Sequence, residues 1–297
     1  EYFLSKGANK DVKMGRSENP AILIACENKN LEAIQFLLDN QVNVNAKDKH
    51  GVTSLHMACK LGRKDIVEKL LTSQILDVNE GNPLEMLCGT VPTDPMRAQK
   101  LEIAKLLLGN VGREFNIEIN QESDSGSTPF LAACKAKNLE IAMMIYQYRG
   151  FDNNVNIKLK DGLTPLHHLC SVKDNTELLN LLLTNTEIDV NSRNNDEETP
   201  LFKACDEGQI EIVRLLLEHR DIDVNSWNTM DETPLFKACE EGQIEIVRLL
   251  LKHPSIDVNS VYTQNPVYVE KETQDDETEI HLSLIHISEP TRRDGIS

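Results

Sequence analysis

The sequence has little basic charge and no long hydrophobic run. Its 297 residues include 48 Asp and Glu against 31 Lys and Arg, which gives a formal net charge of −17. Phosphate groups repel such a chain, so this balance argues against nucleic acid or an anionic membrane surface as the main partner. No stretch approaches the roughly 18 consecutive apolar residues that a membrane-spanning helix needs. We therefore expect neither a nucleic-acid partner nor a membrane.

The motifs of common catalytic and cofactor sites are also missing. We find no glycine-rich phosphate loop, no His-Glu-x-x-His zinc motif and no nucleophile-elbow sequence. Asp and Glu are numerous, but they fall on expected turns and outer helix faces, where solvated charge is the usual arrangement. The sequence therefore predicts no catalytic residues, no metal, no cofactor and no enzyme activity.

What the sequence does contain is a long internal repeat. Residues 199–226 read TPLFKACDEGQIEIVRLLLEHRDIDVNS and recur at residues 233–260, where four of the 28 positions differ and 24 are identical. The two copies are 34 residues apart. A period of this length is typical of solenoid proteins, in which each unit packs only on its neighbours.

Each unit predicts two short helices. Thr199 and Pro200 suit the N-cap and first position of a helix, because the hydroxyl accepts from a free N–H and proline needs no partner there. Gly208 suits the left-handed end of that helix. A second helix with a broad apolar stripe follows at residues 210–217. Since neither helix is long enough to be stable alone, neighbouring units must cover them.

These residues resemble the ankyrin repeat. The resemblance rests on the Thr-Pro-Leu start, the Ala-Cys pair, the Ile-Val-x-Leu-Leu-Leu run and the Asp-Val-Asn ending, and it extends over about residues 19–261. The family's unit is two antiparallel helices and a projecting β-hairpin finger. The resemblance therefore implies an all-α ankyrin-repeat solenoid of seven whole helix-turn-helix repeats with β-hairpin or loop fingers, preceded by a partial repeat.

We predict four segments along the chain. Residues 1–18 are the remnant of a preceding repeat and its loop, residues 19–263 the ankyrin-repeat domain, and residues 264–281 a linker or the start of a further repeat. Residues 282–297 begin with LSLIHISEPTR, which is identical to a translated transposon adapter from DNA library preparation. We interpret this tail as non-native; the alternative is a natural apolar tail. We expect the chain to be a fragment of a longer protein. This expectation is compatible with a signal peptide upstream of residue 1.

The seven cysteines occupy the same position in each of the seven units. The alternatives are a redox or zinc framework and a small buried apolar residue. Spacings of 29 to 46 residues match no zinc pattern, and stacked helices lie about 8–10 Å apart, too far for disulfides. We therefore favour buried free thiols, which indicate a reducing compartment such as the cytoplasm. The cysteines are Cys26, Cys59, Cys88, Cys134, Cys170, Cys205 and Cys239.

Two local departures from the repeat pattern carry further expectations. The third repeat holds insertions at residues 89–100 and 109–119, which belong in loops that either carry function or drift neutrally. Glu197 and Asp231 occupy the finger place that glycine holds in three other repeats. Because glutamate adopts positive φ poorly, we predict a different turn in the last fingers.

The resemblance also suggests where a partner binds. In the family, partners lie along a concave face made by the fingers and the solvent side of the first helices. The family's structural histidine corresponds to His56 and His167, which we expect to make hydrogen bonds without proton chemistry. An acidic strip on the first helices of the sixth and seventh repeats favours a partner with a basic patch. The candidate contact residues are Trp227, Met230, Arg193, Asn194, Asp206, Glu207, Glu240, Glu241, Lys60 and Lys135.

Two functions are compatible with these features. The first is a non-catalytic, monomeric protein–protein interaction scaffold that binds a partner in its concave groove. The second is the targeting or substrate-recognition arm of a larger enzyme, such as a kinase or ubiquitin ligase, whose catalytic part lies outside this chain. Trp227, the one tryptophan, is either an interface anchor or packs on the next finger.

Overall fold

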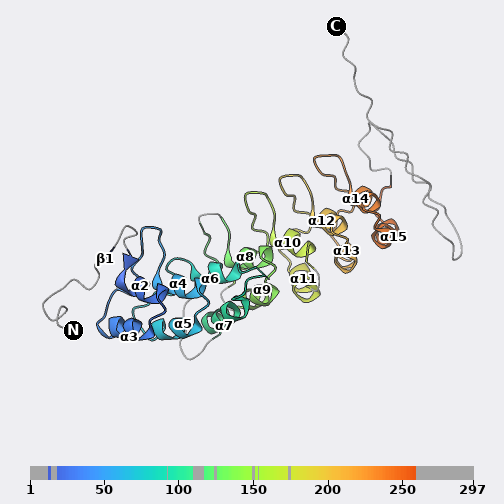
Figure 1. Cartoon of the computed structure of the whole chain (residues 1–297). Helices are drawn as coiled ribbons and strands as arrows, with labels where there is room; N and C mark the ends of the chain where they lie inside the picture. The colour runs from blue at the N-terminus through green and yellow to red at the C-terminus, as the bar shows by residue number, and fades with distance from the viewer. Residues whose placement is uncertain are drawn as a thin grey trace, which may run out of the picture.

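The computed structural model describes residues 13–14 and 19–258, except residues 92, 110–116, 124–125, 149–150, 153 and 173–174. Within them, fourteen helices form seven antiparallel pairs that stand side by side in two rows (Figure 1). The first helices of the pairs are α2 (Ala21–Glu27), α4 (Ser54–Lys60), α6 (Pro83–Cys88), α8 (Pro129–Lys135), α10 (Pro165–Cys170), α12 (Pro200–Asp206) and α14 (Pro234–Glu240). The second helices are α3 (Leu31–Asp39), α5 (Lys64–Leu70), α7 (Arg97–Leu108), α9 (Leu139–Tyr146), α11 (Thr176–Leu183), α13 (Ile210–Leu217) and α15 (Ile244–Lys252).

This arrangement confirms the predicted all-α solenoid of seven repeats. Each first helix packs on the first helices beside it, and each second helix on its own neighbours. The fingers project from the row of first helices (Figure 1). A short antiparallel pair, β1 (Lys13–Met14) with β2 (Asn19–Pro20), precedes the array. Most of the predicted N-terminal remnant, the predicted linker and the adapter-like tail lie outside the described residues.

The first helices begin as their sequences predict. The Thr199 hydroxyl accepts from the backbone N–H of Phe202 at 3.2 Å, and Thr233 repeats this contact with Phe236 at 3.2 Å. Thr53, Thr128 and Thr164 cap their helices in the same way. Gly208 ends α12 at φ +64°. Each cap satisfies one backbone donor that the helix itself leaves unpaired.

The two near-identical units show how far each repeat depends on its neighbours. In the sixth repeat Phe202 is 3% exposed and Cys205 is fully buried. The same residues in the seventh repeat, Phe236 and Cys239, are only partly buried. The sequences match, so the difference comes from the helix pair α14–α15 that covers the sixth repeat on one side. Burial in this fold is therefore supplied by the adjacent unit.

A ladder of asparagine side chains joins consecutive repeats. The side-chain amide of Asn191 donates to the carbonyl oxygen of Asp221 at 2.6 Å, and its oxygen accepts from the N–H of Asp223 at 2.8 Å. Both partners belong to the loop after the next second helix. The same pair of bonds is made by Asn45, Asn156 and Asn225. The asparagine of the Val-Asn ending thus fixes these four units to the ones that follow.

The insertion predicted at residues 89–100 is only partly a loop. Its last residues form the first turn of α7, which begins at Arg97. The Asp94 carboxylate accepts from the N–H of Met96 at 2.7 Å and pairs with Lys100 at 2.6 Å. Met96 lies against Gly62 of the second repeat, where an added Cβ would stand 3.1 Å from it. The insertion therefore packs on the array. Most of the second insertion lies outside the described residues.

Candidate functional site

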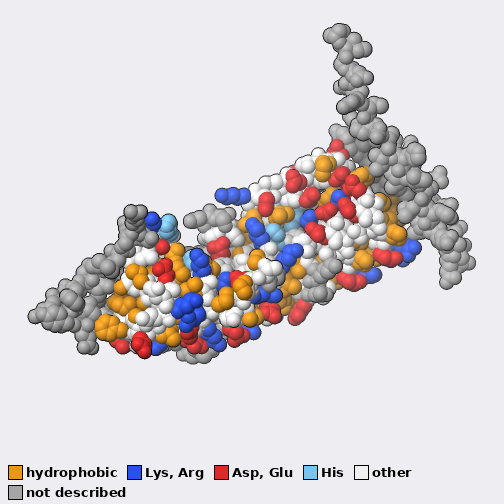
Figure 2. Space-filling view, in the orientation of Figure 1, with side chains coloured by type: hydrophobic (Ala, Val, Ile, Leu, Met, Phe, Trp, Pro, Cys, Tyr) orange, Lys and Arg blue, Asp and Glu red, His pale blue; other side chains and the backbone are white. Residues whose placement is uncertain are grey.

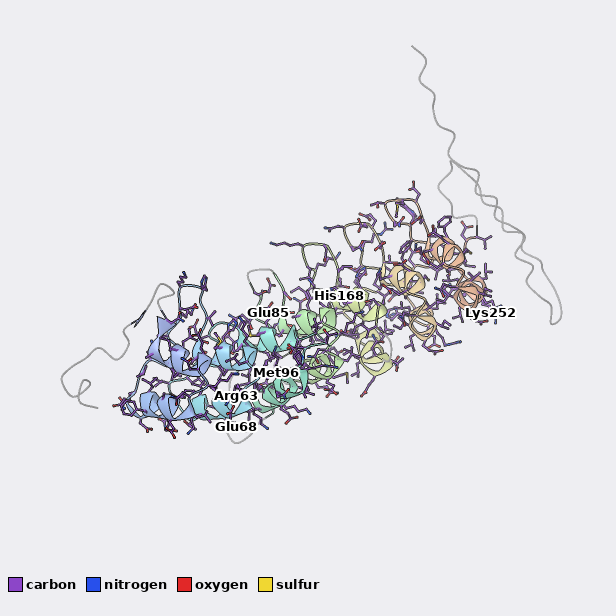
Figure 3. The ribbon with its side chains drawn as sticks, in the orientation of Figure 1. Arg63, Glu68, Glu85, Met96, His168 and Lys252 are labelled. Carbon is purple, nitrogen blue, oxygen red and sulfur yellow. The ribbon has the colours of Figure 1, made fainter. Side chains whose placement is uncertain are left out.

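The predicted contact residues lie on the fingers and on the exposed side of the first helices, and we call this surface the finger face. In Figure 3, Glu85 and His168 mark the row of first helices, while Arg63 and Glu68 lie toward the second helices. The finger face comprises finger residues 47–52, 80–81, 121–123, 158–163, 193–198 and 227–232 and the exposed ends of α4, α8, α12 and α14.

The prediction of a different turn in the last fingers is wrong. Glu197 and Asp231 both adopt φ +60°, in the same left-handed region as Gly51 at φ +79°. The oxygen of the Asn194 side chain accepts from the N–H groups of Asp196 and Glu198, both at 2.9 Å. Asp48 makes the corresponding contacts in the first finger. These side-chain bonds hold the turn closed, so the cost of positive φ at a non-glycine residue does not change its shape.

The later fingers also bind one another. The N–H of Asn195 donates to the carbonyl oxygen of Asp161 at 3.0 Å, and the N–H of Thr229 donates to that of Asp196 at 2.9 Å. The Lys158 ammonium donates to the carbonyl oxygen of Arg193 at 2.9 Å. Three successive fingers are thus joined through their backbones. Side chains at their tips are presented on a fixed frame.

Trp227 stands on this frame with its ring half exposed. The guanidinium of Arg193 lies 5.5 Å from the ring centroid, and it also donates to the Trp227 carbonyl oxygen at 3.4 Å. Arg193 pairs in addition with Glu197 at 3.0 Å. The Trp227 side chain remains 50% exposed, and Met230 on the same finger is 68% exposed. The ring therefore packs partly on the preceding finger, through a cation–π contact, and keeps open apolar surface.

The predicted acidic strip is a mixed ion network. Lys203 pairs with Asp206 at 2.7 Å and with Glu207 at 3.3 Å. Lys237 lies 2.8 Å from Glu240, 2.9 Å from Glu241 and 3.5 Å from Asp206. These carboxylates raise the pKa of Lys237, whose charge is therefore firmly held. Two lysines thus offset four carboxylates, and the strip carries half the negative charge that the acidic residues alone suggest. Figure 2 shows acidic side chains over α12 and α14.

Earlier repeats place basic residues at the corresponding positions. Lys60 and Lys135 occupy the place of Asp206 and are exposed. Lys47 forms an ion pair with Glu80 across the first two fingers. The structure therefore brings Asp206, Glu207, Glu240 and Glu241 together, sets Arg193 against Trp227, and leaves Lys60 and Lys135 apart from both groups.

The histidines are held as hydrogen-bonding groups. His56 Nδ1 lies 3.0 Å from the carbonyl oxygen of Gly81, and His167 Nε2 lies 3.0 Å from that of Glu198. Both bonds reach the finger of the next repeat, as the resemblance implies. Burial lowers the pKa of His167 to about 4, so its ring is neutral near pH 7. Burial likewise lowers the pKa of the neighbouring His168 to about 4.

The cysteines lie in the core, in the positions that the repeat pattern predicts. All seven are free, six are buried, and Cys239 is partly buried. Burial raises the pKa of Cys26 and Cys59 to about 12, and it raises that of the other five as well. A thiol with a raised pKa is a poor nucleophile and a poor metal ligand near pH 7. Across the described ranges, no three His, Cys, Asp or Glu side chains gather as metal ligands.

A hollow of about 290 Å³ opens at the N-terminal end of the array, between α2 and α3. Its lining is apolar and amide-bearing, and contains no titratable side chain: Ala21, Ile24, Ala25, Asn28, Asn30, Ala33, Phe36 and Leu37. None of the described helices combines the length and apolar character needed to cross a membrane.

Sequence reasoning missed two features of this surface. The asparagine ladder was present in the sequence as the recurring Val-Asn ending, and a count of polar residues at a fixed repeat position would have found it. The pairing of Lys203 and Lys237 with the acidic strip follows from helical spacing of three and four residues. The bond between Lys237 and Asp206 joins two repeats and depends on how their helices pack.

Comparison with known proteins agrees with this geometry. A family model described as ankyrin repeats, in three copies, matches residues 1–82, 96–194 and 168–262. These ranges cover most of the chain, including repeats on both sides of the insertions.

Curated relatives match through parts of their own length. The chain is 30% identical over 149 residues to the nuclear factor NF-kappa-B p105 subunit of Gallus gallus, covering 48% of this chain and 14% of that protein. It is 38% identical over 72 residues to the tyrosine-protein kinase HTK16 of Hydra vulgaris, covering 22% of this chain and 10% of that protein. It is 26% identical over 194 residues to the NAD-dependent deacetylase sir2B of Dictyostelium discoideum, covering 63% of this chain and 24% of that protein. The chain therefore spans less than a quarter of each of these relatives.

Proposed function

The chain belongs to the ankyrin-repeat family, and from this premise we propose that it is a non-catalytic scaffold that binds a protein partner in a concave groove along the finger face. Ankyrin repeats are in general protein–protein interaction modules. The single observation that carries the proposal is the frame of joined fingers, which presents half-exposed Trp227 and exposed Met230 away from the core. We further propose that it acts as a monomer in the cytoplasm.

The proposed absence of catalysis is supported by the state of the reactive side chains. Burial holds His167 neutral and raises the pKa of the thiols, so neither His167 nor these cysteines are poised for proton transfer or nucleophilic attack near pH 7. The exposed carboxylates of the finger face instead bind lysines of the same chain. These groups favour recognition over turnover.

The experiment uses the whole chain as bait in a lysate of its source, followed by identification and purification of the bound protein. The dissociation constant is then measured for the parent and for variants of the finger face. We expect at least one of the variants Lys60→Ala, Lys135→Ala, Trp227→Ala and Glu207→Gln to weaken binding, and Glu211→Gln on the exposed side of α13 to leave it unchanged. A partner that binds all of these variants like the parent argues against the finger face.

A second candidate is favoured by the names of two relatives, which are a tyrosine-protein kinase and an NAD-dependent deacetylase. In this alternative the repeats are the targeting arm of a larger enzyme, of a class such as kinase or ubiquitin ligase. Recovery of the full transcript separates the candidates. A catalytic domain joined to either end supports the alternative, whereas repeats and linkers alone support the scaffold.

A further inference from the structure

We propose that the finger face of repeats six and seven binds a positively charged protein segment that places one aliphatic or aromatic side chain on Trp227 and Met230. We call this part of the surface the acidic half, and define it as residues 193–198 and 227–232 with positions 203, 206, 207, 237, 240 and 241. This inference rests on the proposed function, because it names the class of partner that the same surface takes.

Charge changes sign along the finger face. The acidic half holds three basic against nine acidic side chains: Arg193, Lys203 and Lys237 against Asp196, Glu197, Glu198, Asp206, Glu207, Asp231, Glu232, Glu240 and Glu241. The described residues at the matching positions of repeats two to five hold six basic against four acidic: Lys47, Lys49, Lys60, Lys135, Lys158 and Lys160 against Asp48, Glu80, Glu122 and Asp161. A cationic segment is therefore attracted to the last two repeats and repelled from the others.

The lysines of the acidic half are already shared among several carboxylates. Lys237 contacts three of them, and Lys203 contacts two. Glu207, Glu240 and Glu241 are the more exposed members of the network, with side chains 41%, 47% and 42% exposed. A guanidinium or ammonium group from a partner can join these carboxylates without displacing a lysine. The network is thus preorganised for added positive charge.

Apolar surface lies beside this charge. Trp227 and Met230 are the exposed large hydrophobic side chains on the described finger residues, and Arg193 lies over the Trp227 ring. Exposed tryptophan on a fixed frame is a frequent anchor in protein interfaces, with polar groups around it. The combination of an apolar anchor and surrounding carboxylates fits a segment with one apolar side chain among Lys or Arg residues.

Comparison of the two last fingers shows that the turn does not require Trp227 and Met230 at its tip. Asn194 and Asn228 make the same bonds, and both turns close in the same way. At equivalent tip positions, however, one finger has Arg193 and Asp196 where the other has Trp227 and Met230. Because the turn forms with either pair, the apolar side chains contribute surface that folding of the finger does not use.

The test uses the full chain and a displayed library of random 12-residue peptides, which span about 40 Å when extended and so can cross both repeats of the acidic half. Enriched peptides are synthesised, and their binding is measured by the fluorescence of Trp227, which is the one tryptophan of the chain. We expect enriched sequences to carry net positive charge and a shared aliphatic or aromatic residue, and to shift the Trp227 emission on binding.

Two double variants, each with a matched control, test the contacts. The first variant combines Trp227→Ala with Met230→Ala, and its binding is measured by the fluorescence anisotropy of a labelled peptide. The second combines Glu207→Gln with Glu241→Gln. We expect each of them to weaken peptide binding about tenfold. The controls are Ile75→Ala with Ile244→Ala for exposed apolar area, and Glu211→Gln with Glu245→Gln for charge; both should stay within about twofold of the parent. Circular dichroism checks that each variant keeps its helices.

The results separate this inference from the function on which it rests. Acidic or uncharged enriched peptides, no enrichment at all, or equal binding by test and control variants would overturn the inference. If the natural partner is then weakened by Lys60→Ala and Lys135→Ala but not by the acidic-half variants, the scaffold function stands and its binding site lies in the earlier repeats. If no finger-face variant affects the natural partner, both proposals fail.

Discussion

At the residue scale, the contacts that join one repeat to the next are made by a few side chains in fixed positions. Asn191 and its equivalents bridge to the backbone of the following unit with one donor and one acceptor. His56 and His167 bind the carbonyl oxygen of the following finger. A side chain that reaches backbone groups holds its neighbour regardless of the neighbour's own side chains. This explains how tip residues can differ while the stacking stays the same.

Removal of one rung of the ladder should weaken the junction between repeats. Asn191→Ala eliminates two hydrogen bonds, so we expect the free energy of unfolding to fall by about 1–3 kcal/mol. Asn191→Asp keeps the acceptor but turns a carboxylate oxygen toward the carbonyl oxygen of Asp221, and should cost at least as much. Chemical denaturation of the parent and both variants measures the difference. Equal stability of Asn191→Ala and the parent would show that water replaces these bonds without loss.

Protonation of His167 should destabilise the fold at low pH. The ring has a pKa of about 4 in the folded chain against 6.5 as the ordinary value, because burial disfavours its charge. The unfolded chain therefore binds the proton first as pH falls. Stability is complete above pH 6.5 and is lost between pH 6.5 and 4, by up to about 3 kcal/mol from this group.

The chain itself supplies the variant that tests this, since Phe202 and Phe236 occupy the same position in the next two repeats. His167→Phe should flatten the fall in unfolding free energy between pH 6.5 and 4, measured by urea denaturation at several pH values. Part of the slope remains, because burial also lowers the pKa of His168. A variant with the slope of the parent would mean that His167 binds its proton equally in the folded and unfolded chain.

At the element scale, the finger turn is set by a side chain at its first position and not by glycine at its fourth. Asp48 and Asn194 accept the same two N–H groups, while the fourth position is Gly51 in one finger and Glu197 in the other. The preference of glycine for positive φ lowers the cost of the turn. The side-chain bonds determine its shape.

Two opposite substitutions should separate these contributions. Gly51→Ala introduces a Cβ at φ +79° with no atom within 4 Å, so the cost is conformational, and we expect about 1 kcal/mol of destabilisation. Asp231→Gly relieves φ +60° and should stabilise by about 0.5 kcal/mol. Thermal denaturation ranks both against the parent. The opposite order would show that tip contacts, and not the backbone, control the turn.

At the scale of the whole molecule, the array buries its repeats unequally. Interior units are covered on both sides, whereas Phe236 and Cys239 in the seventh repeat are more accessible than their identical counterparts Phe202 and Cys205. A solenoid has no single core, so protection at its ends depends on one neighbour only. Opening is expected to begin there.

Cysteine labelling measures this difference directly, because one thiol lies at the same place in each repeat. We expect Cys239 to react with iodoacetamide first in the native chain, and the six buried cysteines to react only as the array opens. Mass spectrometry of peptides taken at increasing times gives the order. A Cys239→Ala variant should lose the fast phase; if Cys134, at the middle of the array, reacts equally fast, the ends are not the weak points.

The sequence by itself determined the fold class and the helix starts. The reason is that a solenoid is built from local patterns, such as Thr-Pro caps and apolar stripes, which need only neighbouring residues to be read. It also placed the cysteines and His167 correctly as buried or bonded groups. The same local logic failed at Glu197 and Asp231, since a φ preference of one residue was weighed without the side-chain bonds around it.

Only the tertiary structure decided which groups face one another across repeats. Arg193 lies over Trp227, and Lys237 binds Asp206, although each pair is separated by 31 or more residues. These contacts depend on the rise and rotation between adjacent helix pairs, which no single repeat contains. The charge that the finger face presents, and the side of Trp227 that stays open, are therefore properties of the stacked array.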